Sequence, residues 1–134
     1  HTGRPKTLDE RFFTHYAASA DGRHVSARAR LHPPTTEPDN RFVYAVRRSD
    51  LDIMDHVNNA IHLDFVEQCL HDAGKRIDSG LSVRTRIEYG EAIEYGEPVE
   101  AAYFHTDQGT WVTLTQAGRT RSVFLLDPRD HEAK

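Results

Sequence analysis

The stretch DLDIMDHVNNAIHLDFVEQ, residues 50–68, decides how this chain folds. It places four aspartates, two histidines and two adjacent asparagines around an apolar pattern with helical spacing. Spacings of three and four residues are typical of a helix with one buried face. The positions with this spacing are His62, Val66, Cys69, Leu70 and Ala73. The stripe is broadened by Ile61, Leu63 and Phe65. We therefore expect a helix that is buried over most of its circumference and ends near Gly74.

Runs rich in β-branched and aromatic residues lie on both sides of this helix. One run precedes it, RFVYAVRR at residues 41–48, whose apolar side chains alternate as in a strand. Four runs follow, separated by glycine-containing turn signals: LSVRTRIEY at 81–89, EPVEAAYFH at 97–105, GTWVTLTQ at 109–116 and RTRSVFLL at 119–126. The pattern predicts an α+β domain, with a five-stranded antiparallel sheet folded around one long central helix. The pattern does not predict the order of the strands in the sheet.

The chain divides into three parts. Its 134 residues suit one ordinary domain. Residues 1–40 form an N-terminal extension, with a short helix expected in TLDERFFTHYAA, capped by Thr7, and a proline-rich connector HPPTTEPDN. The compact domain is expected at residues 41–128, and residues 129–134 are expected to be a C-terminal tail.

Composition argues against several classes of partner. With 17 basic and 21 acidic residues the net charge is −4, which gives no reason to expect nucleic acid or an anionic membrane. No apolar run approaches the ~20 residues of a membrane-spanning helix, and the first residues lack the apolar core of a signal peptide. The single Cys69 excludes a disulfide within the chain and suits a reducing compartment, so we expect a cytoplasmic protein.

Two motifs carry a resemblance to a known family. The order of a strand, SDLD, HVNN, a helix and then IEYGEAIEYGEPV resembles the hotdog-fold acyl-acyl carrier protein (acyl-ACP) thioesterases and their relatives that act on acyl-coenzyme A, including the 4-hydroxybenzoyl-CoA type. The match is detailed from Val46 to Val99 and continues by strand pattern to Leu126. It implies that two hotdog units pair, as a homodimer, a higher homo-oligomer or two halves of one chain. Residues 1–40 resemble the connector that follows a first half.

The resemblance also implies a site. Asp52 stands at the position of the catalytic aspartate, and His56 matches the family histidine. Asp52 would activate water or attack the thioester directly, while His56 orients the substrate or moves a proton. At the start of the helix, the backbone amides of Val57, Asn58 and Asn59 are candidate donors to the thioester carbonyl, because unpaired N–H groups and the positive end of the helix dipole meet there.

Several residues depart from the family pattern. Met54 replaces an asparagine, and Ala92 stands where the plant enzymes carry a catalytic glutamate. Glu91 is adjacent to Ala92, but it would need a bulge at Gly90 to reach the site, because neighbouring side chains on a strand face opposite ways. His62 stands where the family often has Tyr, and we expect it to contact substrate.

The expected reaction is hydrolysis of an acyl thioester of acyl carrier protein or coenzyme A, without a metal or other cofactor. One alternative is a catalytically silent hotdog unit that binds acyl chains or acts as a scaffolding half. Another is an enoyl-thioester hydratase, although its D-x-N-x-x-H pattern is one residue longer than the spacing here. A metal site at His56 and His62 with Asp52 or Asp55 lacks further ligands at a recognised spacing. Three arginines are candidate phosphate contacts: Arg47, Arg48 and Arg84.

Overall fold

A computed structural model describes residues 9–20, 31–75 and 83–128. Its elements, in chain order, are α1 (Glu10–Ala20), β1 (Asn40–Tyr44), the short 3-10 helix η1 (Arg48–Asp50), α2 (Asn59–Asp72), β2 (Val83–Tyr89), β3 (Val99–Thr106), β4 (Gly109–Gln116) and β5 (Arg119–Pro128). The predicted Thr7 cap and the tail at 129–134 lie outside the described residues. No helix within the described residues is long and apolar enough to cross a membrane.

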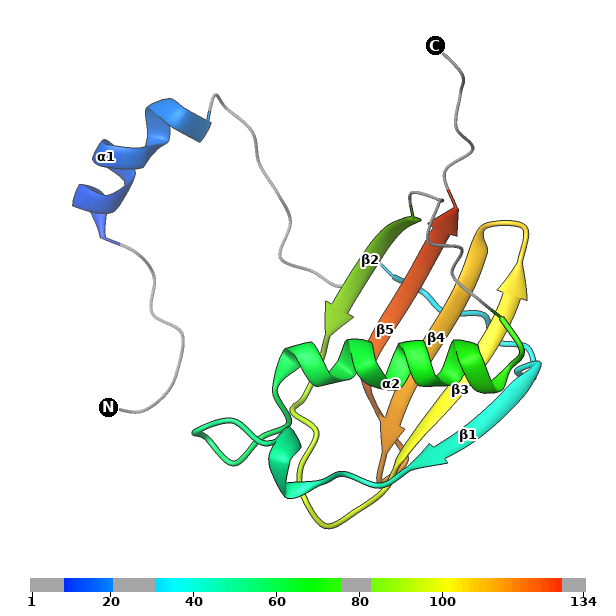
Figure 1. The fold of residues 1–134 in the computed structure, drawn as a ribbon. Coiled ribbons are helices and arrows are strands. Elements are labelled where there is room, and N and C mark those ends of the chain that lie inside the picture. Colours follow the sequence, from blue (N-terminus) through cyan, green and yellow to red (C-terminus); the bar gives the residue numbers. More distant parts are fainter. Residues whose placement is uncertain (1–8, 21–30, 76–82, 129–134) are drawn as a thin grey trace.

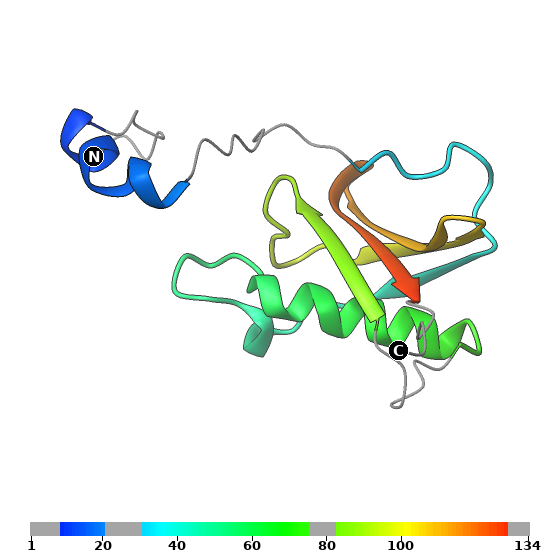
Figure 2. The same ribbon diagram turned by 90° about the horizontal axis from the view of Figure 1, so that it is seen from above.

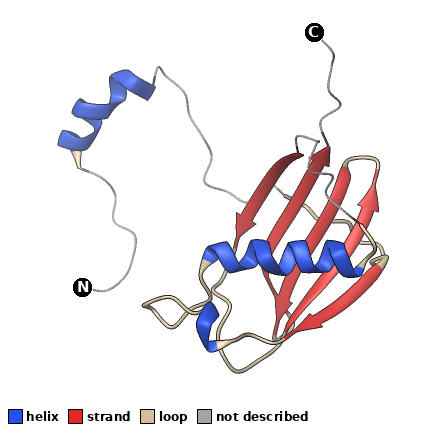
Figure 3. Ribbon diagram, in the orientation of Figure 1, coloured by secondary structure: helices blue, strands red, loops and turns tan. Residues whose placement is uncertain are grey.

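The five strands form one antiparallel sheet in the order β1-β3-β4-β5-β2. Helix α2 lies across one face of this sheet, as Figures 1 and 3 show, and the view from above places it along that face only (Figure 2). The sequence therefore predicted the strands and the central helix correctly. The first strand is shorter than expected, because it ends at Tyr44 and the chain then turns into η1.

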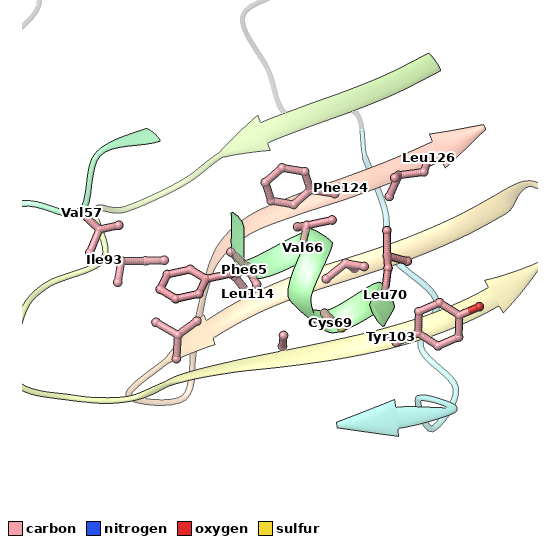
Figure 4. Close-up of a cluster of buried hydrophobic side chains, with 13 residues drawn as sticks. Val57, Phe65, Val66, Cys69, Leu70, Ile93, Tyr103, Leu114, Phe124 and Leu126 are labelled. Atoms are coloured by element: carbon pink, nitrogen blue, oxygen red, sulfur yellow. The ribbon is translucent and has the colours of Figure 1, made fainter. Parts of the chain in front are cut away.

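The core lies between α2 and the inner face of the sheet. Five residues of α2 are buried: His62, Phe65, Val66, Cys69 and Leu70. They meet strand residues that alternate inward, among them Leu114 and Phe124 (Figure 4). The prediction that α2 is buried over most of its circumference is wrong for the single chain, because Leu63 is exposed together with the charged residues of that side.

The C-terminal end of α2 is closed as the sequence predicts. Gly74 has a φ of 70°, which favours glycine. The Gly74 N–H donates to the His71 carbonyl at 2.9 Å, and the Lys75 N–H donates to the Leu70 carbonyl at 2.8 Å. These two bonds form a Schellman motif, so the last carbonyls of the helix are paired.

The other face of the sheet carries a second apolar cluster. Its members are Ala102, Phe104, Trp111, Val123 and Leu125, with Leu31 packed against them. The alternation of β5 therefore sends 122, 124 and 126 toward α2, and 123 and 125 away from it.

Candidate active site

Helix α2 begins at a well-formed cap. Asn58 has non-helical backbone angles, and its Oδ1 accepts a hydrogen bond from the Ala60 N–H at 2.9 Å. The Asn58 carbonyl accepts from the Ile61 N–H at 2.9 Å. Asn58 is therefore the N-cap of α2, and its side chain is committed to the helix.

A buried carboxylate fixes the chain just before the candidate site. Asp50 is 1% exposed and accepts hydrogen bonds from the Arg47 backbone N–H at 2.7 Å, the Arg47 Nε at 3.1 Å and the Ser49 hydroxyl at 3.3 Å. Burial raises the pKa of Asp50, but the bonds from Arg47 outweigh it and hold the pKa below its usual range. Asp50 is thus ionised and structural.

Asp52 lies in the exposed loop that follows, which projects beyond the end of the sheet (Figure 1). Its Oδ1 accepts from the Met54 N–H at 2.8 Å and the His56 N–H at 3.3 Å. Its own N–H donates to the His56 carbonyl at 2.8 Å, and an isolated bridge joins Leu51 to Val57. The loop therefore holds one carboxylate oxygen in place, while Oδ2 accepts no hydrogen bond from the described residues.

His56 is half-buried at the base of the same loop. Its backbone forms an isolated antiparallel bridge with Glu94, in the segment that joins β2 to β3. Its imidazole makes no hydrogen bond with the described residues. The ring is therefore available to a substrate, whereas the backbone that carries it is fixed.

Two of the three backbone N–H groups predicted to bind substrate already donate to carbonyls of the chain. The Val57 N–H donates to the Ile93 carbonyl at 2.9 Å, and the Asn58 N–H donates to the Asp50 carbonyl at 2.9 Å. The expectation that these two amides polarise a substrate carbonyl is therefore corrected. Asn59 is the first residue of α2, and its N–H has no acceptor among the described residues. The helix tip thus offers one donor, at the positive end of the helix dipole.

His62 lies inside the protein rather than at the mouth of the helix. It is 2% exposed, and its Nδ1 lies 3.0 Å from the Ser122 hydroxyl of β5. The Tyr89 ring packs edge-on against it at 5.3 Å. Burial lowers the pKa of His62 to about 4, so the ring is neutral at pH 7. The structure makes it a satisfied core histidine, without an open path to substrate in the single chain.

Glu91 is paired with two arginines of β5 and not with a residue of the candidate site. Its carboxylate accepts from Arg119 at 3.0 Å and from Arg121 at 3.0 Å. Arg121 is the extra residue of an irregularity in the β4–β5 register, where Leu114 pairs with Ser122 and Thr115 pairs with Thr120. No interaction among the described residues links Glu91 to Asp52 or His56. The bulge at Gly90 that Glu91 would need is not seen, since β2 pairs with β5 in regular register up to Tyr89 and the Gly90 N–H just beyond it donates to the Arg121 carbonyl at 2.7 Å.

Two of the three arginines expected to contact phosphate have partners within the chain. Arg47 binds Asp50, and the Arg48 guanidinium lies 4.8 Å from the centre of the Tyr95 ring. Arg84 is exposed on β2. Their predicted role as phosphate contacts stays a prediction. Among the described residues no group of three His, Cys, Asp or Glu side chains is placed to hold a metal ion.

Sequence reasoning missed Gln116. This residue ends β4, is 3% exposed, and makes three hydrogen bonds to the backbone of the segment between β2 and β3. The signal was present, because Gln116 continues the inward-facing row of Val112 and Leu114, where a polar residue needs a partner.

Comparison with known proteins gives a consistent result. Residues 34–122 match the family model of the acyl-ACP thioesterase C-terminal domain. No curated protein matches the chain. The chain is similar to the 12:0-ACP thioesterase of Umbellularia californica, with 16% identity and a TM-score of 0.68 over 96% of this chain and 51% of that chain.

Two bacterial structures are also similar. One is a thioesterase of Thermus thermophilus complexed with coenzyme A and Zn, at 23% identity and a TM-score of 0.56, covering 72% of this chain and 88% of that chain. The other is an acyl-ACP thioesterase of Bacteroides thetaiotaomicron, at 13% identity and a TM-score of 0.56, covering 78% of this chain and 42% of that chain. These similarities confirm the hotdog fold. The chain spans about half the length of the two acyl-ACP thioesterases.

Proposed function

This chain belongs to the acyl-ACP thioesterase C-terminal domain family, and from that premise we propose that it hydrolyses acyl thioesters carried on acyl carrier protein or coenzyme A. One observation carries the proposal. The Asp52 carboxylate is held by two backbone N–H groups of its own loop, next in the chain to a helix tip that offers the unpaired Asn59 N–H. A fixed base and a fixed donor are the two groups that acyl transfer to water requires.

In the proposed reaction Asp52 takes a proton from water as the water oxygen adds to the thioester carbonyl carbon. The developing negative charge on the carbonyl oxygen is stabilised by the Asn59 N–H and by the helix dipole. Collapse of the tetrahedral intermediate breaks the carbon–sulfur bond and releases a thiolate, which takes up a proton. His56 orients the thioester or delivers that proton. Direct attack by Asp52, followed by hydrolysis of the resulting anhydride, uses the same groups.

The site of a single chain is open, so the proposal includes a second hotdog unit as its cover. Ile53 and Met54, at the tip of the loop, are 103% and 67% exposed. Tyr89 and Tyr95 are also exposed. A folded domain rarely leaves such side chains uncovered together. β1 and β2 each have a neighbour on one side only within the sheet, which leaves two edges for pairing. The mass in solution, measured by light scattering, tests the pairing.

The test of the reaction is release of free thiol from acyl-coenzyme A and acyl-ACP substrates by the purified protein. Asp52→Asn keeps the hydrogen bonds of the loop but removes the base, and should lower kcat by about 10²- to 10⁴-fold. Asp55→Asn is the matched control, because Asp55 is an exposed acid of the same loop whose φ of 58° Asn tolerates. Full activity in Asp52→Asn would exclude Asp52 as the base.

The second candidate is a catalytically silent hotdog unit. Met54 and Ala92 stand where the family pattern has Asn and Glu, and the Glu91 carboxylate is paired with two arginines. An acyl thioester that binds the purified wild-type protein without release of thiol would favour this candidate.

A further inference from the structure

The end of β4 places a buried amide beneath the loops that form the candidate site. Val112 and Leu114 are fully buried on the inner face of the sheet. Gln116 continues this row, next to a register shift between β4 and β5 at Leu114 and Thr115. A buried amide costs stability unless its donors and acceptor are paired, so its partners show what it holds.

All the partners of the Gln116 amide are backbone groups of one segment. Its Oε1 accepts from the Glu94 N–H at 2.9 Å. Its Nε2 donates to the Glu94 carbonyl at 2.8 Å and to the Glu97 carbonyl at 2.9 Å. The side chain therefore fixes both the position and the orientation of Glu94, which is otherwise an exposed residue outside any strand.

The same segment holds the candidate active-site loop. Glu94 forms the bridge with His56, and the Ile93 carbonyl accepts from the Val57 N–H at 2.9 Å. Val57 and Ile93 also lie side by side at one end of the core (Figure 4). A continuous set of contacts thus runs from Gln116 through Glu94 and Ile93 to His56 and Val57. The next two residues are the N-cap Asn58 and the free donor Asn59.

We propose that Gln116 is a positioning residue for thioester hydrolysis: it holds the backbone of Glu94, and through it His56 and the tip of α2, in the geometry that the reaction requires. The expected effect on kcat rests on the proposed function, whereas the expected effect on the backbone at Glu94 and Val57 does not. Gln116 itself lies beneath the loop and does not contact substrate.

The test compares two substitutions in the same row of β4. Gln116→Met keeps the length of the side chain and removes the three hydrogen bonds. Val112→Ala removes core volume in the same row and leaves the three hydrogen bonds of Gln116 in place. We expect Gln116→Met to lower kcat by about 10- to 100-fold, the size of effect that a misplaced group produces, with KM changed less than about twofold. Val112→Ala should lower the melting temperature at least as far and leave kcat near the wild-type value.

Amide hydrogen exchange gives a readout that does not depend on activity. Exchange at the Val57 N–H should be faster by about tenfold in Gln116→Met, as expected for the loss of one net hydrogen bond. Exchange at Thr113, in the middle of β4, should change no more than in Val112→Ala. A wild-type protein that hydrolyses nothing overturns the proposed function, while the exchange at Val57 still decides the positioning role. Equal kcat and equal Val57 exchange in the two variants would overturn that role.

Discussion

The body of α2 and its N-terminal tip are held by different forces. Along the body, Phe65, Val66, Cys69 and Leu70 are buried against the inner face of the sheet. At the tip, residues 58–60 are exposed, and the chain is fixed by hydrogen bonds that the Asp50 carboxylate, the Asn58 side chain and the Ile93 carbonyl accept. Packing of apolar area provides most of the stability of a fold, whereas each hydrogen bond adds about 1 kcal/mol but sets a direction. The body therefore sets whether the protein folds, and the tip carries the groups that we propose for the reaction.

The largest expected effect tests the body of α2. Phe124 is fully buried in the cluster that faces the helix. Phe124→Ala should lower the free energy of unfolding by about 3 to 5 kcal/mol, because it leaves a cavity under α2. Urea denaturation measures this loss. At a temperature where the variant is still folded, kcat for thioester hydrolysis should stay near the wild-type value. A large fall in kcat of the folded variant would show that the two regions are not separable.

The next effect depends on pH and on the buried imidazole of His62. The unfolded chain binds a proton near the ordinary pKa of 6.5, whereas the folded protein, with its pKa lowered to about 4, stays neutral. Lowering the pH through this window therefore favours the unfolded state. His62 should remove about 3 kcal/mol of stability between pH 6.5 and pH 4.

The variant His62→Gln isolates this effect. Gln does not titrate, and its amide can still bond the Ser122 hydroxyl. We expect the difference in unfolding free energy between wild type and His62→Gln to change by about 3 kcal/mol from about pH 7 to about pH 4. Parallel pH curves for the two proteins would show that His62 is not kept neutral by burial.

The contrast between the two regions also explains what the sequence predicted. Alternation in the strands and the spacing of three and four in α2 report burial, so the sheet, the helix and its Gly74 end were predictable. The Asn58 cap was predictable because it is local. The bonds from Val57 to Ile93 and from Gln116 to Glu94 join residues far apart in the chain, and no periodicity reports them. The pairing of Glu91 with Arg119 and Arg121 likewise joins residues far apart in the chain.

A smaller effect is expected from the carboxylate that anchors the tip. Folding lowers the pKa of Asp50, so its ionised carboxylate stabilises the folded protein. This stabilisation is complete above the pKa of the unfolded chain, near 4, and is lost as the pH falls through the lower pKa of the folded protein. Asp50→Asn keeps one acceptor oxygen but not the charge, and should cost about 2 kcal/mol at pH 7. The cost should shrink below about pH 4. Thermal unfolding at pH 7 and pH 3 measures the change, and a cost independent of pH would contradict an ionised Asp50.

The smallest effect concerns the Asn58 cap itself. It separates the role of the tip as the end of the helix from its proposed role as a donor to substrate. Asn58→Ala removes the bond to the Ala60 N–H and should cost about 1 kcal/mol, whereas Asn58→Ser should cost a few tenths. The loss of activity in Asn58→Ala should exceed what this loss of stability explains, because the neighbouring Asn59 N–H is the proposed donor to the thioester carbonyl. Asn58→Ser restores a cap and should restore kcat. If kcat followed stability alone in both variants, the tip would act only as the end of a helix, and the proposed donor would have to be sought elsewhere.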